Sequence, residues 1–300
     1  MEKEKPYHIP VLVKEVLEYL APRPDGIYLD VTFGGGGHTR AILAHEPKCE
    51  VVAMDWDLSA LERNGLPLQE EFPDRLTLVW GNFTQLDKKL KKVGIHSVDG
   101  ILADFGTSQF QLTERPGFSF HADTELDMRM SSAHQKITAA DVVNNATEKE
   151  LITIFKELGE EHQARAIARL IVQERKKKKI KTTKQLTQII ERIKGPKGPK
   201  RIHPATKAFQ ALRIYVNKEL ENIAAFFPAA LRVLKPGGKL VCISFHSLED
   251  RLVKQFFKEL ATQAEPKARL LAPKAISASP EEVAQNSASR SAKLRAIELI

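Results

Sequence analysis

The sequence predicts a doubly wound α/β domain that is interrupted by a helical insertion. Short apolar segments that read as buried strands alternate with helical segments over the first third of the chain. Helical patterns alone occupy residues 113–201, and a strand-like segment returns at residues 239–245. Short apolar strands separated by helices are typical of a parallel sheet with helices on both faces. We therefore expect residues 1–112 and 202–300 to form one discontinuous domain and residues 113–201 to form the helical insertion.

The individual elements follow from their residue patterns. Apolar runs predict parallel strands at residues 26–32, 50–55, 76–80, 98–104 and 239–245. Helical spacing predicts helices at residues 38–44, 85–92, 147–158, 160–175, 182–193, 204–233 and 248–260. Residues 235–238, with the sequence Lys-Pro-Gly-Gly, predict a turn. Two last strand-like segments, 267–276 and 292–300, are expected to pair antiparallel at the edge of the sheet.

Positive charge is concentrated in one block of the chain. The formal net charge is +8, yet residues 169–201 alone hold 13 Lys or Arg against 2 acids, so the rest of the chain is slightly acidic. Lysines dominate residues 175–181, and Lys184 and residues 194–201 continue the block. A local basic surface of this kind is typical of a protein that binds a polyanion. A solvated charge run is the alternative interpretation.

Composition excludes several classes of protein. The hydrophobic fraction of 42% is enough for a folded core and argues against a disordered chain. Cys49 and Cys242 lie far apart in apolar runs, so neither a zinc site nor a disulfide is expected. The N-terminal residues contain no apolar signal core, and no run approaches the ~18 apolar residues of a membrane span. We therefore expect a cytoplasmic protein that does not enter a membrane.

A run of four glycines, Gly34 to Gly37, lies between the first predicted strand and the helix that begins at His38. Glycines at this place let the backbone turn sharply and approach a ligand closely. Four in succession would cost too much chain entropy for a segment that served only as a turn. The nicotinamide pattern G-x-G-x-x-G does not fit, because its last position would fall on Thr39 or Arg40. The run therefore predicts a binding loop and weakens a dehydrogenase interpretation.

Two residues farther along the chain are candidates for the same binding site. Asp55 closes the second predicted strand about 20 residues after the glycines, where an acid can accept hydrogen bonds from both hydroxyls of a ribose. A helix N-cap is the alternative role, although Asp57 could fill it instead. Phe83 follows the third predicted strand, where it could flank an adenine ring or belong to the core.

Candidate catalytic residues follow the fourth and fifth predicted strands. In open α/β sheets the chemistry lies beyond the carboxyl ends of the strands, and Asp104 stands there, followed by glycine and small polar residues. Capping a turn or holding the cofactor are its alternative roles. Phe245 could stack on an extruded base, and His246 could contact a base or a phosphate. Glu249 and Asp250 lie in the first turn of a helix, where the helix dipole alone would explain them.

These segments belong to a longer, ordered set of motifs. The set includes residues 30–38, Arg115-Pro-Gly-Phe-Ser-Phe120, Leu126-Asp-Met-Arg-Met130, His203-Pro-Ala-Thr206, Phe209-Gln-Ala-Leu-Arg-Ile214 and residues 244–251. With this set the chain resembles, from His8 to Arg295, the 16S rRNA (cytosine-N4) methyltransferases of the RsmH or MraW family. A single glycine loop would be a weak signal, whereas the ordered set is highly specific.

The resemblance implies a class I, Rossmann-like methyltransferase fold, in which residues 113–201 form an inserted substrate-recognition domain. It implies S-adenosyl-L-methionine as the cofactor, contacted by Gly36, Gly37, His38, Asp55, Phe83, Asp104 and Gln111. The implied reaction is methylation of N4 of a decoding-centre cytidine in 16S rRNA of the small ribosomal subunit. Whether the enzyme is a monomer or a homodimer does not follow from it.

The implied reaction has a specific chemical need that Asp104 could meet. The lone pair of an exocyclic base amine is delocalised into the ring, so an enzyme must orient the nitrogen toward the methyl group and accept its hydrogens. Asp104, with a nearby carbonyl, could do both, and it could take the released proton or pass it to water. The cytosine would have to leave its stack to reach Asp104. The basic block would bind phosphates and position the RNA without reading its sequence.

The chain departs from the family pattern at two places. Gln109 and Phe110 stand where the family usually has Ser and Pro beside the proposed pocket. Residues 286–290 read Asn-Ser-Ala-Ser-Arg where Asn-Pro-Arg is usual. Three alternatives are a dehydrogenase, a methyltransferase of DNA or another RNA, and a non-enzymatic RNA-binding assembly factor. The last would need neither the glycine run nor Asp104.

Overall fold

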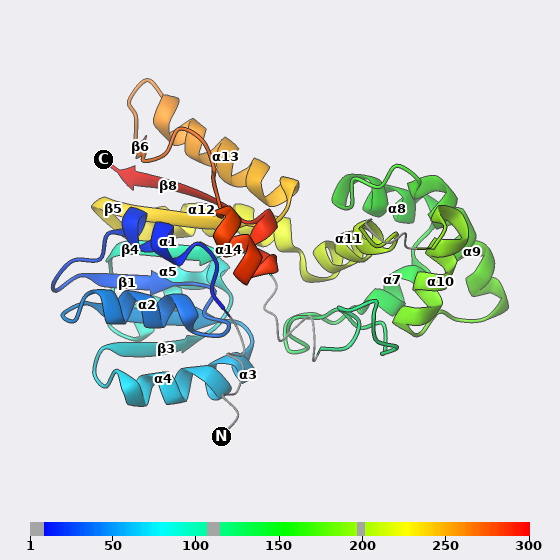
Figure 1. Cartoon of the computed structure of the whole chain (residues 1–300), viewed down its shortest axis with the longest axis horizontal. Coiled ribbons are helices and arrows are strands. Elements are labelled where there is room, and N and C mark those ends of the chain that lie inside the picture. Colours follow the sequence, from blue (N-terminus) through cyan, green and yellow to red (C-terminus); the bar gives the residue numbers. More distant parts are fainter. Residues whose placement is uncertain (1–8, 107–114, 197–201) are drawn as a thin grey trace. The chain divides into compact units, whose positions relative to one another are not determined.

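A computed structural model describes residues 9–106, 115–196 and 202–300 (Figure 1). The chain forms two compact units, one made of Met1–Ser108 with Leu220–Ile300 and the other of Gln109–Glu219. The sequence predicted that the helical insertion ends at residue 201 and that the α/β domain resumes at residue 202. The structure moves this boundary because α11 (Thr206–Asn217), which had been assigned to the α/β domain, buries its apolar face in the core of the helical unit.

One mixed sheet forms the centre of the first unit, with the strand order β3-β2-β1-β4-β5-β8-β6 and with β7 paired to β8 (Figure 1). The parallel strands are β1 (Ile27–Asp30), β2 (Glu50–Asp55), β3 (Leu76–Trp80), β4 (Val98–Asp104) and β5 (Leu234–Ser244). After β3 the chain crosses to the other side of β1. The carboxyl ends of β1 and β4 therefore flank the position where doubly wound sheets bind ligands.

The last three strands are β6 (Ala268–Leu270), β7 (Ile276–Ser277) and β8 (Lys293–Leu299), and β8 pairs antiparallel with β5, β6 and β7. This confirms the predicted antiparallel pairing, although the first predicted segment forms two short strands and β8 lies between β5 and β6. The predicted turn at residues 235–238 is instead an irregularity within β5. Val98 pairs with Leu234, and Gly100 already pairs with Lys239.

Helices cover both faces of the sheet, as the sequence predicted. One core cluster packs α5 (Leu86–Lys92), α12 (Glu219–Val233) and α13 (Ser247–Thr262) against the sheet. A second cluster, on the opposite face, contains α1 (Val13–Leu20), α2 (Gly37–His45) and α4 (Leu66–Glu71). The short helix α3 (Leu58–Ala60) and a π-helical turn (Leu61–Gly65) precede α4, and α14 (Pro280–Gln285) precedes β8. Helix α1 was not predicted.

The helical unit contains α7 (Ala139–Asn145), α8 (Glu148–Thr153), a π-helical turn (Ile154–Leu158), α9 (Ala164–Lys177), α10 (Thr183–Lys194) and α11. Capping boxes at Thr138, Thr147 and Thr182 start three of these helices. The predicted helix 204–233 is in fact two, because Lys218 adopts a φ of 51° after α11. Throughout the described residues, no helix is long and apolar enough to cross a bilayer.

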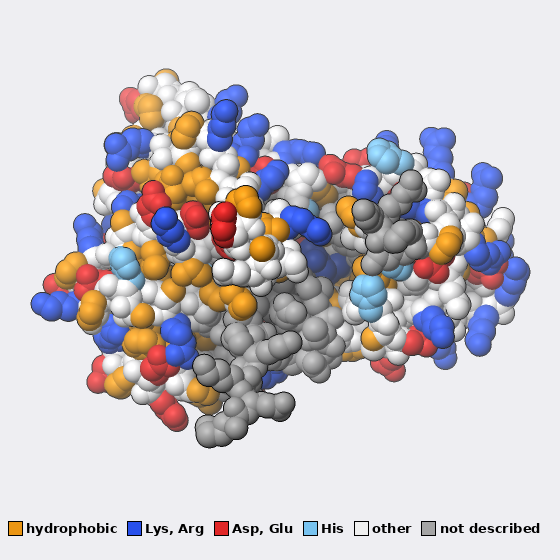
Figure 2. Space-filling model, viewed as in Figure 1, with side chains coloured by type: hydrophobic (Ala, Val, Ile, Leu, Met, Phe, Trp, Pro, Cys, Tyr) orange, Lys and Arg blue, Asp and Glu red, His pale blue; other side chains and the backbone are white. Residues whose placement is uncertain are grey.

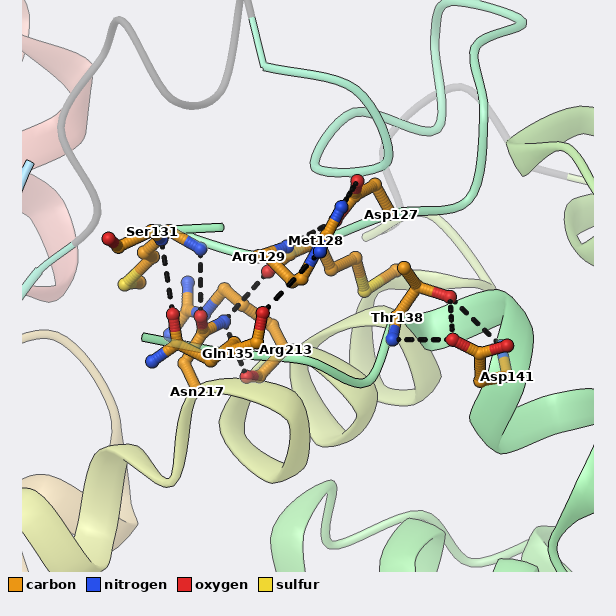
Figure 3. A network of polar contacts seen from close by, with 10 residues as sticks. Asp127, Met128, Arg129, Ser131, Gln135, Thr138, Asp141, Arg213 and Asn217 are labelled. Carbon is orange, nitrogen blue, oxygen red and sulfur yellow. Dashed lines mark hydrogen bonds and ion pairs between the residues drawn. The ribbon is translucent and has the colours of Figure 1, made fainter. Parts of the chain in front are cut away.

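A polar network fixes the irregular segment 127–131 within the helical unit (Figure 3). Asn217, which is fully buried, accepts the Met130 N–H at 2.8 Å and donates to the Met128 carbonyl at 2.8 Å. The guanidinium of Arg129 donates to both oxygens of Asp127, at 2.7 and 2.8 Å. The end of α11 thus holds a segment that has no regular hydrogen bonding of its own.

Candidate active site

The glycine run shapes the connection between β1 and α2. Gly36 has a φ of +75° immediately before α2, a conformation that side chains rarely adopt. A Cβ at Gly36 would lie 2.8 Å from the Phe33 ring, and one at Gly37 would lie 2.7 Å from Cγ of Pro10. These close approaches give the two glycines a packing role that the sequence did not reveal. Their contact with a cofactor stays a prediction.

Asp55 ends β2 and is tied directly to the glycine run. Its Oδ2 accepts the Gly34 N–H at 2.8 Å, and its Oδ1 accepts the Asp57 N–H at 2.8 Å. Burial raises the pKa of Asp55 to about 7, and the two backbone hydrogen bonds only partly offset that cost. Asp57 is the N-cap of α3, accepting the Ser59 N–H. Asp55 is therefore not the cap of that helix, and its remaining lone pairs can accept hydrogen bonds from a ligand.

Asp104 is the last residue of β4, and its backbone N–H is hydrogen-bonded. Its N–H donates to Oγ1 of Thr32 at 2.7 Å, which links β4 to the loop after β1. Oδ2 lies 3.7 Å from Nδ1 of His38, whereas the buried Oδ1 has no hydrogen-bond partner among the described residues. Burial raises the pKa of Asp104 to about 6. Nearby Asp30 and Glu249 add to the rise, whereas His38 and the backbone N–H of Gly106 oppose it. The carboxylate is thus enclosed and only partly satisfied.

His38 stands at the start of α2 and is almost fully buried. Its Nε2 lies 2.8 Å from the Val11 carbonyl oxygen, which can only accept, so Nε2 carries a hydrogen. Nδ1 is therefore the nitrogen that faces Asp104. The 3.7 Å between Nδ1 and Oδ2 of Asp104 is longer than a hydrogen bond.

Asp30, at the end of β1, is a further buried acid beside Asp104, and its residue pattern had not marked it as a candidate. It accepts hydrogen bonds from the hydroxyl of Thr39 at 2.8 Å and from the N–H of Thr32 at 3.1 Å. Burial raises the pKa of Asp30, and nearby His38 only partly offsets this rise. Its position at the end of a predicted strand, directly before the glycine run, could have identified it as a candidate site residue. We call the ends of β1, β2 and β4, with the glycine run, the carboxyl edge.

Phe83 packs in an aromatic cluster of the sheet unit. Its ring makes edge-to-face contacts with Phe226 at 5.5 Å and with Phe105 at 6.1 Å between centroids. Phe83 is partly buried against the core. The core role left open by the sequence is therefore real, and the adenine contact stays a prediction.

Phe245 and His246 follow β5. The Phe245 ring lies against the backbone after Asp104, since a Cβ at Gly106 would be 2.5 Å from its Cε2. His246 is the N-cap of α13: its Nδ1 accepts the Glu249 N–H at 3.4 Å, and its Nε2 lies 3.2 Å from Oε1 of Glu249. The sequence did not predict this capping role. Contact of either ring with substrate stays a prediction.

The two acids after His246, Glu249 and Asp250, accept hydrogen bonds from other residues of the protein. Oε2 of the fully buried Glu249 accepts the Phe245 N–H at 2.8 Å. Asp250 accepts two hydrogen bonds from Arg295, at 2.7 and 3.1 Å. A purely structural role, which the sequence left open, therefore fits both acids. Gln111, Gln109 and Phe110 lie outside the described residues.

The basic block belongs to the helical unit, where Figure 2 shows Lys and Arg side chains projecting from the surface. Arg175 and Lys194 are used internally: Arg175 donates to the Ala146 carbonyl at 2.6 Å, and Lys194 lies 2.6 Å from Glu161. The exposed lysines of the block are Lys176, Lys177, Lys178, Lys179, Lys181 and Lys184, and Arg169 and Arg192 are exposed as well. Residues 197–201 lie outside the described residues. The exposed lysines are the ones available to a polyanion.

Comparison with known proteins gives matches over nearly the whole chain. The profile of the MraW methylase family matches residues 5–300. The chain is 46% identical to the ribosomal RNA small subunit methyltransferase H of Thermomicrobium roseum, over 98% of this chain and 94% of that protein. The protein of the same name from Syntrophotalea carbinolica is 46% identical over 99% of both chains. A solved putative rRNA methylase from Clostridium thermocellum is similar with a TM-score of 0.46 at 12% identity, covering 97% of this chain and 99% of that one.

The carboxyl edge fits the cofactor of a methylase. Asp55, at the end of β2, has lone pairs that can accept hydrogen bonds from a ligand. Asp104, at the end of β4 on the other side of β1, has an Oδ1 with no partner among the described residues. The chain is a methyltransferase, and its cofactor is S-adenosyl-L-methionine. With a family match from residue 5 to residue 300, the chain belongs to the MraW methylase family.

Proposed function

We propose that this chain methylates N4 of a decoding-centre cytidine in 16S rRNA within the small ribosomal subunit, in the cytoplasm. The relatives named ribosomal RNA small subunit methyltransferase H, at 45–46% identity, support the substrate class. The observation that carries the proposed chemistry is Asp104: a buried acid at the end of β4 whose Oδ1 has no partner among the described residues.

Asp104 orients the amine in this proposal. Its Oδ1 accepts one hydrogen of the exocyclic amine, which draws electron density back to the nitrogen and turns the lone pair toward the methyl group. S-adenosylmethionine, when bound, supplies an electrophilic methyl group on sulfur. The backbone hydrogen bond from the Asp104 N–H to Thr32 keeps this carboxylate at the strand end while the base is held.

The proton released from N4 also has a place to go. With a pKa of about 6, ionised Asp104 is a better proton acceptor than an ordinary carboxylate and is still largely ionised at neutral pH. Nδ1 of His38 faces Oδ2 at 3.7 Å, which is longer than a hydrogen bond, so the imidazole shares the proton only after it moves closer or through a bridging water. Because Nε2 keeps its hydrogen bond to the Val11 carbonyl, the ring does not need to turn.

The other candidate residues hold the two reactants. Asp55 accepts the ribose hydroxyls, Gly36, Gly37 and Gln111 contact the cofactor, and Phe83 flanks the adenine. Phe245, already against Gly106, stacks on the extruded cytosine beside Asp104. His246 contributes by capping α13 and by contacting the base or its phosphate. The exposed lysines of residues 176–184 bind the RNA backbone.

Methyl transfer to defined substrates tests this function. Purified small subunits from a strain that lacks the gene are incubated with the protein and tritiated S-adenosylmethionine, and the rRNA is digested to nucleosides for mass spectrometry. We expect N4-methylcytidine at one site, with naked 16S rRNA as the comparison substrate. Methylation of another nucleoside, or of DNA, would replace the proposed substrate. Cofactor binding without any transfer would favour an assembly factor.

A further inference from the structure

The N-terminal segment, residues 9–12, passes beside the glycine run and is fixed by side chains from the far end of the chain. Oε1 of Glu282 accepts the Leu12 N–H at 2.7 Å, and Nδ2 of Asn286 donates to the Ile9 carbonyl at 2.9 Å. Glu282 belongs to α14 and Asn286 is the residue that follows this helix. These contacts join residues 270 or more positions apart.

The N-terminal segment in turn holds the start of α2. Its Val11 carbonyl accepts the hydrogen of His38 Nε2, and its Pro10 ring lies where a Cβ at Gly37 would be only 2.7 Å away. We propose that Glu282 is a positioning residue for methyl transfer, acting through the N-terminal segment on His38 and Gly37. This inference rests on the proposed cofactor and proton roles of those two residues.

Local backbone geometry explains why the segment needs an external partner. Leu12 has a φ of 53° and a ψ of 33°, the left-handed region that is unfavourable for leucine. Leu12 is fully buried, and the half-buried carboxylate of Glu282 accepts its N–H. No side chain of α1 caps the start of that helix. The carboxylate of Glu282 therefore stabilises a conformation that the local sequence disfavours.

Substitutions on α14 test the proposal through ligand affinity and through His38 itself. We expect Glu282→Ala to weaken binding of S-adenosylhomocysteine, measured by calorimetry, roughly tenfold, the size expected from losing one part-buried charge-assisted hydrogen bond. Glu282→Gln keeps an acceptor oxygen for the Leu12 N–H and should restore most of the affinity. Glu281→Ala removes the same charge from the neighbouring, exposed position and should bind as the unaltered protein does.

The ring of His38 gives a readout that a general loss of stability does not move. In protein labelled with ¹⁵N-histidine, NMR should show His38 as the Nε2–H form, assigned by loss of its signals in His38→Gln. We expect Glu282→Ala to shift these signals toward a mixture of tautomers and Glu281→Ala to leave them unchanged. Asn286→Ala, which releases the segment at Ile9, should shift the His38 signals in the same direction. This variant replaces Glu282→Ala in the test if Glu282→Ala does not fold.

Two outcomes separate this inference from the proposed function. If Glu282→Ala and Asn286→Ala both keep full affinity and an unchanged His38 spectrum, the positioning role is wrong while cofactor binding stands. If the unaltered protein does not bind S-adenosylhomocysteine, the cofactor site itself is wrong, and the spectrum of His38 then reports only whether the segment orients the ring.

Discussion

The pKa values of acidic residues shift in opposite directions at the carboxyl edge and in the helical unit. At the carboxyl edge of the sheet, burial raises the pKa of Asp55 to about 7 and that of Asp104 to about 6. In the helical unit, burial also acts on Asp127, but hydrogen bonds from Arg129 lower its pKa. The pKa of Asp141 is lowered by its hydrogen bonds with Thr138. Asp127 and Asp141 are stabilised as carboxylates by hydrogen bonds within the helical unit, whereas burial outweighs the hydrogen bonds of the acids at the carboxyl edge. Raised pKa values of this kind are common at catalytic sites.

The largest expected effect is on chemistry at the carboxyl edge. Asp104→Ala should lower kcat for methyl transfer by about 10²- to 10⁴-fold, the range for loss of a positioned acid–base group, while circular dichroism shows a folded protein. Asp127→Asn, in the helical unit, should lower the melting temperature and leave kcat within about twofold. The contrast between the two regions fails if Asp104→Ala keeps full activity on small subunits.

Cofactor affinity should depend on Asp55. Asp55→Ala removes both acceptor oxygens that the ribose would use and frees the Gly34 N–H, so we expect affinity for S-adenosylhomocysteine to fall about 10- to 100-fold. Calorimetry measures this directly. Asp57→Asn keeps a cap for α3 and is the matched control, with affinity close to that of the unaltered protein. Equal affinities in all three proteins would remove the ribose role from Asp55.

The helical unit should act on RNA and not on the cofactor. Replacing the exposed Lys178 and Lys179 by Ala should raise KM for small subunits roughly fivefold to tenfold and make the dependence of log K on log salt less steep, by about 0.7–0.9 per lost phosphate contact. Replacing Lys91 and Lys92, exposed at the end of α5, removes the same charge from the sheet unit and should change neither quantity. If both pairs behave alike, the basic block is a solvated surface.

The smallest expected effect is a change in stability with pH. Because the pKa of Asp104 is raised from about 3.9 in an unfolded chain to about 6, the folded state binds the extra proton in this interval. Its contribution to stability is therefore present below about pH 4 and is lost as the pH rises through 6. We expect Asp104→Asn to be more stable than the unaltered protein by about 1–2 kcal/mol at pH 8 in urea unfolding. The difference should disappear near pH 4.

Asp127 and Asp141 should show the opposite sign. Their pKa values are lowered in the folded protein, so they stabilise it above the unfolded pKa of about 3.9 and lose that contribution as the pH falls further. Asp141→Asn should therefore be destabilised at pH 7 and approach the unaltered protein at low pH. If the urea curves of the Asp104 and Asp141 variants respond to pH in the same direction, the electrostatic contrast between the two regions is wrong.

Sequence patterns predicted the parts of the site that depend on neighbouring residues. Asp55 and Asp104 could be placed because each directly follows an apolar run, and the structure ends β2 and β4 at these residues. Both an adenine contact and a core position stayed open for Phe83, since its core partners Phe105 and Phe226 come from separate segments. His246 was missed as a cap because histidine is not among the usual capping residues.

Features that depend on distant segments could not be predicted. The periodicity of α11 shows an apolar face but does not say which core receives it, so its assignment to the α/β domain was wrong. The left-handed Leu12 and its partner Glu282 give no local pattern, because neither residue type favours that conformation or that contact. For the same reason only the structure shows that Oδ1 of Asp104 has no partner among the described residues.

The position of β8 has a consequence for synthesis of the protein. This strand pairs with β5 on one side and with β6 and β7 on the other, and the contact from Glu282 to Leu12 spans 270 residues. Translation delivers the N-terminal residues first. The glycine run therefore emerges long before the strand and the carboxylate that complete its surroundings, so a nascent chain still within its own ribosome cannot yet assemble this edge.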